Sequence, residues 1–338
     1  QIEPKVLFCV DGYFYNGKTH NCLDKIKSFT ARLPSLKQVV IFDYASLSNI
    51  VINNSISYQE ILENYEAIEI GFERVGFDHP LYIMYSSGTT GVPKCLVHGH
   101  GGTLVQHLKE HQLQTNISSG DRVFYFTTCS WMMWNWLVSA LGTGATIMLY
   151  DGSPTYPDNT VLWQFADEEE FSHFGTSAKY IETLMKDEVN PSAIFKLSNL
   201  KVICSTGSPL SAECYDYIYN NVGYVHLASI SGGTDIVSCF VLGVPNIPVR
   251  RGEIQGAGLG MAVEIWDDSG RVNRGERGEL VCTKPFPSRP VKFWNDIDGR
   301  KYHAAYFDRF EGVWAHGDFA EQTPDGGYII YGLSLIHI

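Results

Sequence analysis

The chain has 338 residues, enough to bury a large core and to form two subdomains. Its content of 44% hydrophobic and 13% aromatic residues is that of a globular protein and excludes a disordered one. The formal net charge of −12 argues against a basic surface that binds nucleic acid.

The cysteines and the chain start indicate a reducing environment. None of the 8 cysteines forms a C-x-x-C pair, and several lie in apolar runs, where a free thiol behaves as a small hydrophobe. We therefore expect a cytosolic protein. Residues 1–4 show no charged-then-apolar signal pattern, and no apolar run approaches the roughly 20 residues that cross a bilayer.

Up to about residue 247 the sequence alternates between strand and helix patterns. In chain order, strands are predicted at residues 5–10, 39–42, 81–85, 95–98, 122–127, 145–150, 172–175, 202–205 and 225–228. Helices are predicted at residues 23–33, 58–65, 99–111, 131–142, 161–169, 178–186 and 211–220. Residues 15–18 and 151–154 are expected to be turns, and residues 46–57 a loop. This alternation predicts an α/β region with a parallel sheet covered by helices.

After about residue 248 glycine-rich turns alternate with short strands, and a hairpin turn is expected at residues 267–270. The strands are predicted at residues 261–266, 279–283, 313–316 and 328–331. We therefore predict an α/β region over residues 1–247 and a small, mostly β subdomain over residues 248–332.

Residues 86–94 form a loop of small and hydroxylated residues that ends in Lys94. The loop lies between the apolar run Leu81–Tyr85, expected to be a buried strand, and the strand at Cys95–His98. Glycines allow backbone to approach a ligand, hydroxyls donate hydrogen bonds and an ammonium follows phosphate charge, so this composition predicts a phosphate-binding loop. It is not a Walker A loop, because Val92 and Pro93 separate Gly91 from Lys94.

His107 and His111 are four residues apart and share one face of a predicted helix. A zinc peptidase would place glutamate where Leu108 stands. We therefore expect these histidines to be solvated or to cap the helix, and not to bind a metal.

Residues 85–94 resemble the phosphate loop of the adenylate-forming superfamily, which includes acyl-CoA synthetases, luciferases and the adenylation domains of peptide synthetases. Longer stretches resemble, more closely, the members that activate acetoacetate, and the resemblance extends from Pro4 to Gly332. These stretches are Cys95–His98, Gly101–His111, Trp131–Trp136, Ser205–Leu210 and Ile230–Asp235. The resemblance implies a large domain of acyl-CoA synthetase type with flanked β-sheets and a small β-barrel-like subdomain.

The resemblance also implies a reaction and its small-molecule partners. Acetoacetate would attack ATP to give an acyl-adenylate and pyrophosphate, and coenzyme A would then displace AMP. Mg²⁺ and fixed donors would stabilise the charge on the phosphoryl group. In an acidic protein, this positive charge must be gathered locally.

The family's roles can be carried over to matching positions. Lys94, Thr234 and Asp235 are expected to be catalytic, with the Asp235 carboxylate binding Mg²⁺, which prefers oxygen ligands. An Asx turn or a helix N-cap is the structural alternative for Asp235. The residues expected to bind ATP or AMP are Ser86, Ser87, Gly88, Thr89, Thr90, Gly91, Lys94, Gly207, Ser208, Pro209, Ser231, Gly232, Gly233, Thr234 and Asp318.

Two of these assignments have a specific chemical reason. The Asp318 carboxylate offers two acceptors for the two ribose hydroxyls, although an aspartate in a turn at a strand end is the alternative. At the position of Gly232, acetyl-specific relatives carry a tryptophan that shortens the acyl pocket, so glycine is expected to make room for a longer acyl group. The residues expected to line this pocket are Trp131, Met132, Met133, Thr206 and Gly232, unless the Trp–Met cluster is only core.

The family more often has glutamate at the position of Asp235, and the sequence also departs from the family at its end. After Gly332 the family continues with Arg-Ser-Asp and a mobile C-terminal domain, whereas this chain has residues 333–338, which we expect to be a non-family tail. We therefore expect a fragment that binds nucleotide weakly and turns over little. Another short-chain acyl-CoA or aryl ligase, and a non-catalytic nucleotide-binding module, remain alternatives.

Overall fold

The structure is a computed structural model that describes residues 1–47, 51–86 and 93–333. Within it the chain divides into two compact units. The smaller unit comprises residues 1–75 with 151–161, and the larger unit comprises residues 76–150 with those from 162 onward. Each unit has a hydrophobic core of its own.

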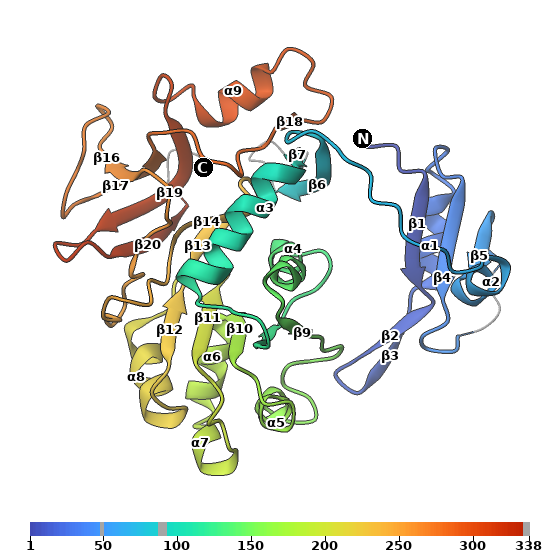
Figure 1. Ribbon diagram of the computed structural model, residues 1–338, viewed down its shortest axis with the longest axis horizontal. Helices are drawn as coiled ribbons and strands as arrows, with labels where there is room; N and C mark the ends of the chain where they lie inside the picture. The colour runs from blue at the N-terminus through green and yellow to red at the C-terminus, as the bar shows by residue number, and fades with distance from the viewer. Residues whose placement is uncertain (48–50, 87–92, 334–338) are drawn as a thin grey trace. The chain divides into compact units, whose positions relative to one another are not determined.

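A parallel three-stranded sheet in the order β1-β4-β5 forms the smaller unit (Figure 1). Leu23 and Ile26, three residues apart on one face of α1, pack with Val39 of β4 in its core. The predicted turn contains Asn16 and Gly17, both with positive φ, and joins β2 to β3. The elements are β1 (Val6–Val10), β2 (Gly12–Tyr15), β3 (Lys18–Asn21), α1 (Leu23–Thr30), β4 (Gln38–Phe42), β5 (Ser55–Ser57) and α2 (Tyr58–Asn64).

Two predictions for the smaller unit need correction. Helix α1 ends at Thr30 and not at Leu33, because the amides of Arg32 and Leu33 bond to carbonyls three residues back, in a tighter turn. Residues 55–57, expected to be loop, form β5, which pairs with β4. Two serines around one isoleucine carry too little apolar pattern to predict a strand.

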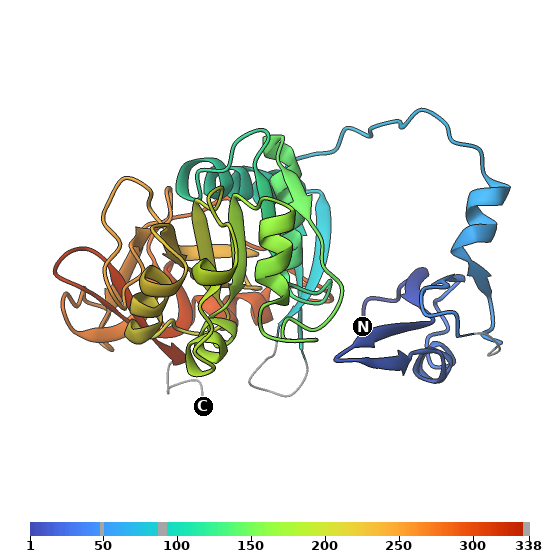
Figure 2. The ribbon, with the colours of Figure 1, turned by 90° about the horizontal axis from the view of Figure 1, so that it is seen from below.

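The larger unit contains the predicted parallel sheet, in the order β12-β11-β10-β8-β9 (Figure 1). Its strands are β8 (Arg122–Tyr125), β9 (Thr146–Met148), β10 (His173–Ser177), β11 (Val202–Thr206) and β12 (His226–Ser229). The helices between them are α4 (Met132–Ser139), α5 (Val161–Glu168), α6 (Ala178–Lys186), α7 (Pro191–Ile194) and α8 (Ala212–Asn221). Green and yellow helices lie beside the strands of the same colours (Figure 2).

Helices cover both faces of this sheet, because successive side chains of a strand point to opposite faces. Val123 and Tyr125 of β8 belong to the core cluster that contains Trp136 of α4. Phe124, between them, stacks on Phe171 and lies tilted against Phe174 of β10. Trp163 of α5 lies parallel to Phe174, with ring centroids 4.6 Å apart. Because the helices pack on the two faces, the carboxyl ends of the parallel strands remain available for a ligand site.

The predicted phosphate loop lies between β6 (Pro80–Ser86) and β7 (Lys94–Gly99), which pair antiparallel in the sheet β18-β7-β6. The prediction of a buried strand is correct for β7, in which Leu96 and Val97 are fully buried. It is wrong for β6, in which Tyr85 is 50% exposed. The reason is pairing: β7 is the central strand, whereas β6 is at the sheet edge. Strand β18 comprises Lys292–Phe293.

The remaining strands pair antiparallel around the carboxyl ends of the parallel sheet. Among the described residues, β16, β17, β19 and β20 form an open sheet in that order, and no closed barrel is formed. Leu333, expected to begin a tail, pairs with Asp318; residues 334–338 lie outside the described residues. The elements are β13 (Ser231–Gly233), β14 (Ser238–Leu242), β15 (Gly256–Ala257), β16 (Val263–Trp266), β17 (Arg277–Cys282), α9 (Arg300–Tyr306), β19 (Trp314–Gln322) and β20 (Tyr328–Leu333).

Helix α3 (His100–Lys109) follows β7 and continues as a π-helix over Glu110–Gln114. A second short helical turn, Ala140–Thr143, extends α4. In the part of the chain that the structure describes, no helix combines the length and apolar character needed to cross a membrane.

Candidate functional site

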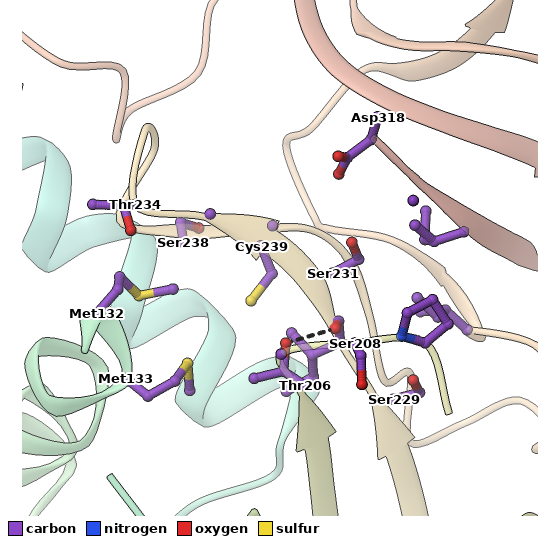
Figure 3. A pocket seen from close by; sticks show the side chains of 18 of the residues that line it. Met132, Met133, Thr206, Ser208, Ser229, Ser231, Thr234, Ser238, Cys239 and Asp318 are labelled. Atoms are coloured by element: carbon purple, nitrogen blue, oxygen red, sulfur yellow. Dashed lines mark hydrogen bonds between the residues drawn. The ribbon is translucent and has the colours of Figure 1, made fainter. Parts of the chain in front are cut away.

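One pocket of about 260 Å³ lies in the larger unit, and stretches far apart in the sequence contribute to it (Figure 3). Thr206 and Ser229 are the last residues of β11 and β12, and parallel strands in α/β folds collect ligands at this end. The predicted site residues that line the pocket are Trp131, Met132, Met133, Thr206, Gly207, Ser208, Pro209, Ser231, Gly232, Gly233, Thr234 and Asp318.

All five residues predicted for the acyl pocket are among these lining residues. Met132 and Met133 extend from the first turn of α4, and both also belong to the core cluster behind it. The two alternatives for this cluster, core and pocket, therefore hold together. The Thr206 hydroxyl donates to the carbonyl oxygen of Ile230 at 2.8 Å, which leaves its methyl group to the pocket (Figure 3).

Gly232 is also required by the backbone itself. A Cβ atom at this position would lie 2.1 Å from the carbonyl oxygen of Ser238 and 2.5 Å from the Cα of Cys239. The strand register shifts between Ser231 and Gly232, which brings β13 close to β14. The glycine therefore permits a close approach of two strands, a reason that the sequence did not reveal.

The wall behind Ser238 contains a buried carboxylate that sequence analysis missed. Glu110 of the π-helix is fully buried, and the Ser238 hydroxyl donates a short hydrogen bond to it. Gln106 donates to Glu110 and Ser238, both at 2.9 Å, and the Trp136 indole donates to Glu110 at 2.9 Å. The Lys109 ammonium lies 3.6 Å from the same carboxylate. This network fixes the Ser238 side chain at the pocket wall.

Of the predicted phosphate loop, only the two ends can be placed. Ser86, at the end of β6, and Lys94, at the start of β7, are directly paired. The Ser86 hydroxyl oxygen is buried and has no hydrogen-bond partner among the described residues. The other predicted members lie outside the described residues: Ser87, Gly88, Thr89, Thr90 and Gly91.

Lys94, Asp235 and Tyr306 form one cluster next to Thr234. The Lys94 ammonium and the Tyr306 hydroxyl both donate short hydrogen bonds to Oδ1 of Asp235. The Lys94 ammonium is also 3.5 Å from the Tyr306 hydroxyl. These contacts run between side chains, so the structure places Asp235 in an ion pair and not in the capping role that was the alternative.

The cluster keeps Asp235 ionised. Burial works to raise the pKa of Asp235, but the Lys94 charge and the hydrogen bonds from Lys94 and Tyr306 outweigh it and lower the pKa. Burial, with the adjacent carboxylate, raises the pKa of Tyr306 far above its ordinary value, so Tyr306 stays a donor. Sequence analysis missed Tyr306, because no motif marks it and 71 positions separate it from Asp235.

Asp235 was predicted to bind Mg²⁺, and its surroundings suit that ion. No group of three or more His, Cys, Asp or Glu side chains that could hold a metal is found among the residues described. Mg²⁺ commonly binds through one or two carboxylates together with substrate phosphates, so a single ionised aspartate beside Lys94, at the end of the predicted phosphate loop, fits.

Asp318 lies within β19, paired with Leu333 of β20, and not in a turn at a strand end. Burial raises the pKa of Asp318, which Asp235 reinforces and His316 opposes. The His316 Nε2 atom is 3.7 Å from Oδ2 of Asp318. Gly317, between them, has a φ of +92° and donates its N–H at 2.5 Å to the fully buried Glu279.

His107 of α3 and His111 of the π-helix are neither solvated nor capping, contrary to expectation. His107 and His111 are fully buried. His107 contacts the carbonyl oxygen of Val237 at 2.5 Å and the Ser139 hydroxyl at 2.8 Å. His111 contacts the carbonyl oxygen of Trp136 at 3.0 Å. Burial lowers the pKa of both histidines, so both are neutral core residues.

Comparison with known proteins gives a consistent result. The model of the family described as "AMP-binding enzyme" matches residues 1–289. The chain is 55% identical to the acetoacetyl-coenzyme A synthetase of Rhizobium meliloti (strain 1021), over 99% of this chain and 52% of that protein. It is 50% identical to the acetoacetyl-CoA synthetase of Gallus gallus, over 99% of this chain and 51% of that protein.

A solved structure is similar over the same extent. The structure is that of an acetoacetyl-CoA synthetase from Streptomyces lividans, with a TM-score of 0.92 and 43% identity. The match covers 98% of this chain and 51% of that one. The mixed α/β architecture is therefore the adenylate-forming fold. The chain spans about half the length of the relatives it matches.

Proposed function

Because the chain belongs to the AMP-binding enzyme family, we propose that it forms the nucleotide- and acyl-binding part of an acetoacetate–CoA ligase. The carboxylate of acetoacetate attacks the α-phosphorus of ATP, which gives acetoacetyl-AMP and releases pyrophosphate. The thiol of coenzyme A then attacks the acyl carbon, which gives acetoacetyl-CoA and releases AMP.

One observation carries this proposal: residues assigned in advance to nucleotide and acyl binding, from four separate stretches, line a single pocket. Met132 and Thr206 belong to the stretches that supply the acyl end. Thr234 and Asp318 come from the nucleotide stretches (Figure 3). A pocket built from unrelated residues would not have combined these assignments.

The nucleotide would be held along the pocket from ribose to phosphates. Asp318 accepts hydrogen bonds from the two ribose hydroxyls, and the Thr234 hydroxyl donates to the α-phosphate. Lys94, with Ser86 and residues 87–91, binds the β- and γ-phosphates. The stretches Gly207–Pro209 and Ser231–Gly233 lie against the adenine and AMP, where small residues allow close approach of backbone.

Adenylation joins two anions, so the site must supply positive charge. Asp235 would hold Mg²⁺, which would supply positive charge to the transferring phosphoryl group. Lys94 supplies a second cation from the chain itself. The Tyr306 hydroxyl keeps the Asp235 carboxylate ionised and in place. Lys94, Thr234 and Asp235 are therefore the proposed catalytic residues.

The acyl end would accept a four-carbon acid. Trp131, Met132 and Met133 provide an apolar wall, and methionine adapts to irregular space. Gly232 lines the pocket without a side chain, so nothing at this position shortens it. The names of the matched relatives favour acetoacetate over other acids of this length.

We further infer that residues 1–247 form the α/β part of the adenylation domain and residues 248–332 a small, mostly β subdomain of it. The antiparallel sheet β16-β17-β19-β20 supports this division. The free cysteines of the described residues are consistent with a cytosolic enzyme.

The proposal is tested by titrating the chain with non-hydrolysable acyl-AMP analogues. We expect the acetoacetyl analogue to bind at least about tenfold more tightly than the acetyl and butyryl analogues, a difference of about 1.4 kcal/mol. Thr234→Val should weaken binding of all three analogues, whereas Thr183→Val, on the surface of α6, should not. Preference for another acyl group would indicate a different short-chain ligase, and no binding would overturn the nucleotide site. ATP–pyrophosphate exchange with the three acids would extend the comparison to catalysis.

A further inference from the structure

Tyr306 is held more rigidly than any other partner of Asp235. Only 2% of its surface is exposed. Its ring stacks on Trp314 with centroids 3.7 Å apart and an interplanar angle of 13°. The rings of Phe293 and Tyr302 contact it edge-on, at 5.8 Å and 5.4 Å. The hydroxyl of Tyr306 is therefore fixed in space by three aromatic neighbours.

Lys94, the other partner of Asp235, has a flexible and partly exposed side chain. Its ammonium is the end of a four-carbon stem, and 27% of its side chain is exposed. It begins β7, directly after the predicted phosphate loop. An ammonium on a flexible stem follows the nearest negative charge, so incoming phosphates compete with Asp235 for Lys94.

Both donors bind the same oxygen of Asp235. The Lys94 ammonium and the Tyr306 hydroxyl bond to Oδ1, and no described residue donates to Oδ2. If Lys94 turned to the phosphates, Tyr306 alone would hold the carboxylate, and Oδ2 would stay open to a cation. A buried carboxylate without a partner would otherwise be costly.

We propose that Tyr306 is a positioning residue, which holds the Asp235 carboxylate while its cation changes from the Lys94 ammonium to Mg²⁺. This inference rests on the proposed function, because it requires Mg²⁺ and ATP at this site. Tyr306 contacts neither of them; it acts through Asp235. Its hydroxyl should therefore matter for the contribution of Mg²⁺ to nucleotide binding, and little for binding without Mg²⁺.

The test compares two tyrosines of the same helix. Tyr306→Phe removes the hydroxyl and keeps the ring on Trp314. Tyr302→Phe is the matched control, because the Tyr302 hydroxyl is also buried but has no hydrogen-bond partner among the described residues. The dissociation constant of ATP is measured by calorimetry with saturating Mg²⁺ and again with EDTA, for both variants and the wild type.

In the wild type, Mg²⁺ should raise the affinity for ATP. Tyr306→Phe should reduce that gain by about tenfold or more, the effect of a lost hydrogen bond to a charged group, and leave the affinity in EDTA nearly unchanged. Tyr302→Phe should keep the full gain. In an Asp235→Asn background the Tyr306→Phe change should have no further effect on the Mg²⁺ gain.

A full gain in Tyr306→Phe, or an equal loss in Tyr302→Phe, would overturn the positioning role and leave the proposed function standing. If the wild type binds ATP in neither condition, the proposed function fails and this inference fails with it. Should Tyr306→Phe not fold, Trp314→Phe takes its place: it keeps the Tyr306 hydroxyl but weakens the stacking that fixes it, so it should reduce the Mg²⁺ gain, and a full gain would overturn the positioning role.

Discussion

Gly232 passes so close to Ser238 that a Cβ atom on the glycine would lie 2.1 Å from the serine carbonyl oxygen. The adjacent Gly233 is different, since the nearest atoms to its Cβ would be those of the His316 ring at 3.6 Å, an ordinary contact. Two neighbouring glycines of one predicted motif therefore have different reasons to be glycine.

The first prediction follows from this difference. Gly232→Ala should lower the free energy of unfolding by about 2 kcal/mol, because backbone atoms cannot yield as a flexible side chain would. Gly233→Ala should change it by less than about 0.5 kcal/mol. Urea unfolding followed by tryptophan fluorescence measures both, and it reports the larger unit because all 7 tryptophans lie there. Equal losses would contradict the close-approach argument.

The second prediction concerns Lys94. In the proposed site its ammonium binds the β- and γ-phosphates, which AMP lacks. Lys94→Met should therefore weaken ATP binding by about tenfold or more but AMP binding by less than about threefold. Calorimetric titration with the two nucleotides decides the matter. If both affinities fell equally, Lys94 would act by holding Asp235 and not by binding the terminal phosphates.

The third prediction concerns Asp318 and the ribose. Asp318→Asn should abolish the wild-type preference for ATP over 2′,3′-dideoxy-ATP, because a neutral amide offers one acceptor where the carboxylate offered two. The dissociation constants of both nucleotides measure this. A variant that still preferred ATP as strongly as the wild type would exclude the ribose role.

The raised pKa of Asp318 has two consequences for the ribose prediction, one for its pH dependence and one for the stability of the Asp318→Asn variant. The folded chain protonates Asp318 at a higher pH than the unfolded chain, so this group lowers stability as pH rises through that range. Asp318→Asn should therefore be no less stable than the wild type at neutral pH. In the wild type, the preference for ATP over 2′,3′-dideoxy-ATP should weaken as the pH falls. Because the pKa of Asp318 is raised, this weakening should begin at a higher pH than it would for an aspartate with an ordinary pKa.

The fourth prediction concerns acid stability. His98 is 1% exposed and contacts the carbonyl oxygen of Thr234 at 3.0 Å. Burial lowers the pKa of His98 from 6.5 to about 4, so between these values the unfolded chain binds a proton that the folded chain does not. The free energy of unfolding should therefore fall as pH falls through this window, by about 3 kcal/mol for this group.

Urea unfolding at about pH 7.5 and about pH 5, followed by tryptophan fluorescence, should show about 2 kcal/mol of this loss, because pH 5 does not reach the lower end of the window. His98→Gln can still donate to Thr234 but does not titrate, so it should reduce the pH dependence. The pKa values of His107 and His111 are lowered as well, so these two histidines will leave part of the pH dependence in the variant. A wild-type stability that is constant across the window would contradict the buried, neutral state of these histidines.

Regular patterns in the sequence predicted the regular parts of the fold. The run Val202–Thr206 and its neighbours alternate with helix patterns, and they form the parallel sheet. The burial of β6 could not be predicted, because Leu81–Tyr85 is as apolar as a central strand. Its exposure results from a position at the sheet edge, which pairing across the chain decides.

The residues of the candidate site likewise include some that the sequence predicted and some that it did not. Residues that recur in motifs, such as Thr206, Thr234 and Asp318, were predicted, and they line one pocket. Tyr306 and Glu110 were missed, because their contacts with Asp235 and Ser238 join residues more than seventy positions apart. A lone tyrosine or glutamate carries no pattern before the chain is folded.

The strand order β18-β7-β6 anchors the two ends of the predicted phosphate loop unequally. Lys94 begins the central strand, whose Cys95 and Val97 carbonyl oxygens accept 2.8 Å hydrogen bonds from the β18 segment. Ser86 ends β6, which pairs with β7 alone among the described residues. If the proposed site binds phosphates, the Lys94 end should therefore stay fixed while the Ser86 end moves more readily. Slow hydrogen exchange is expected at the Val97 amide and faster exchange along β6 as nucleotide enters and leaves.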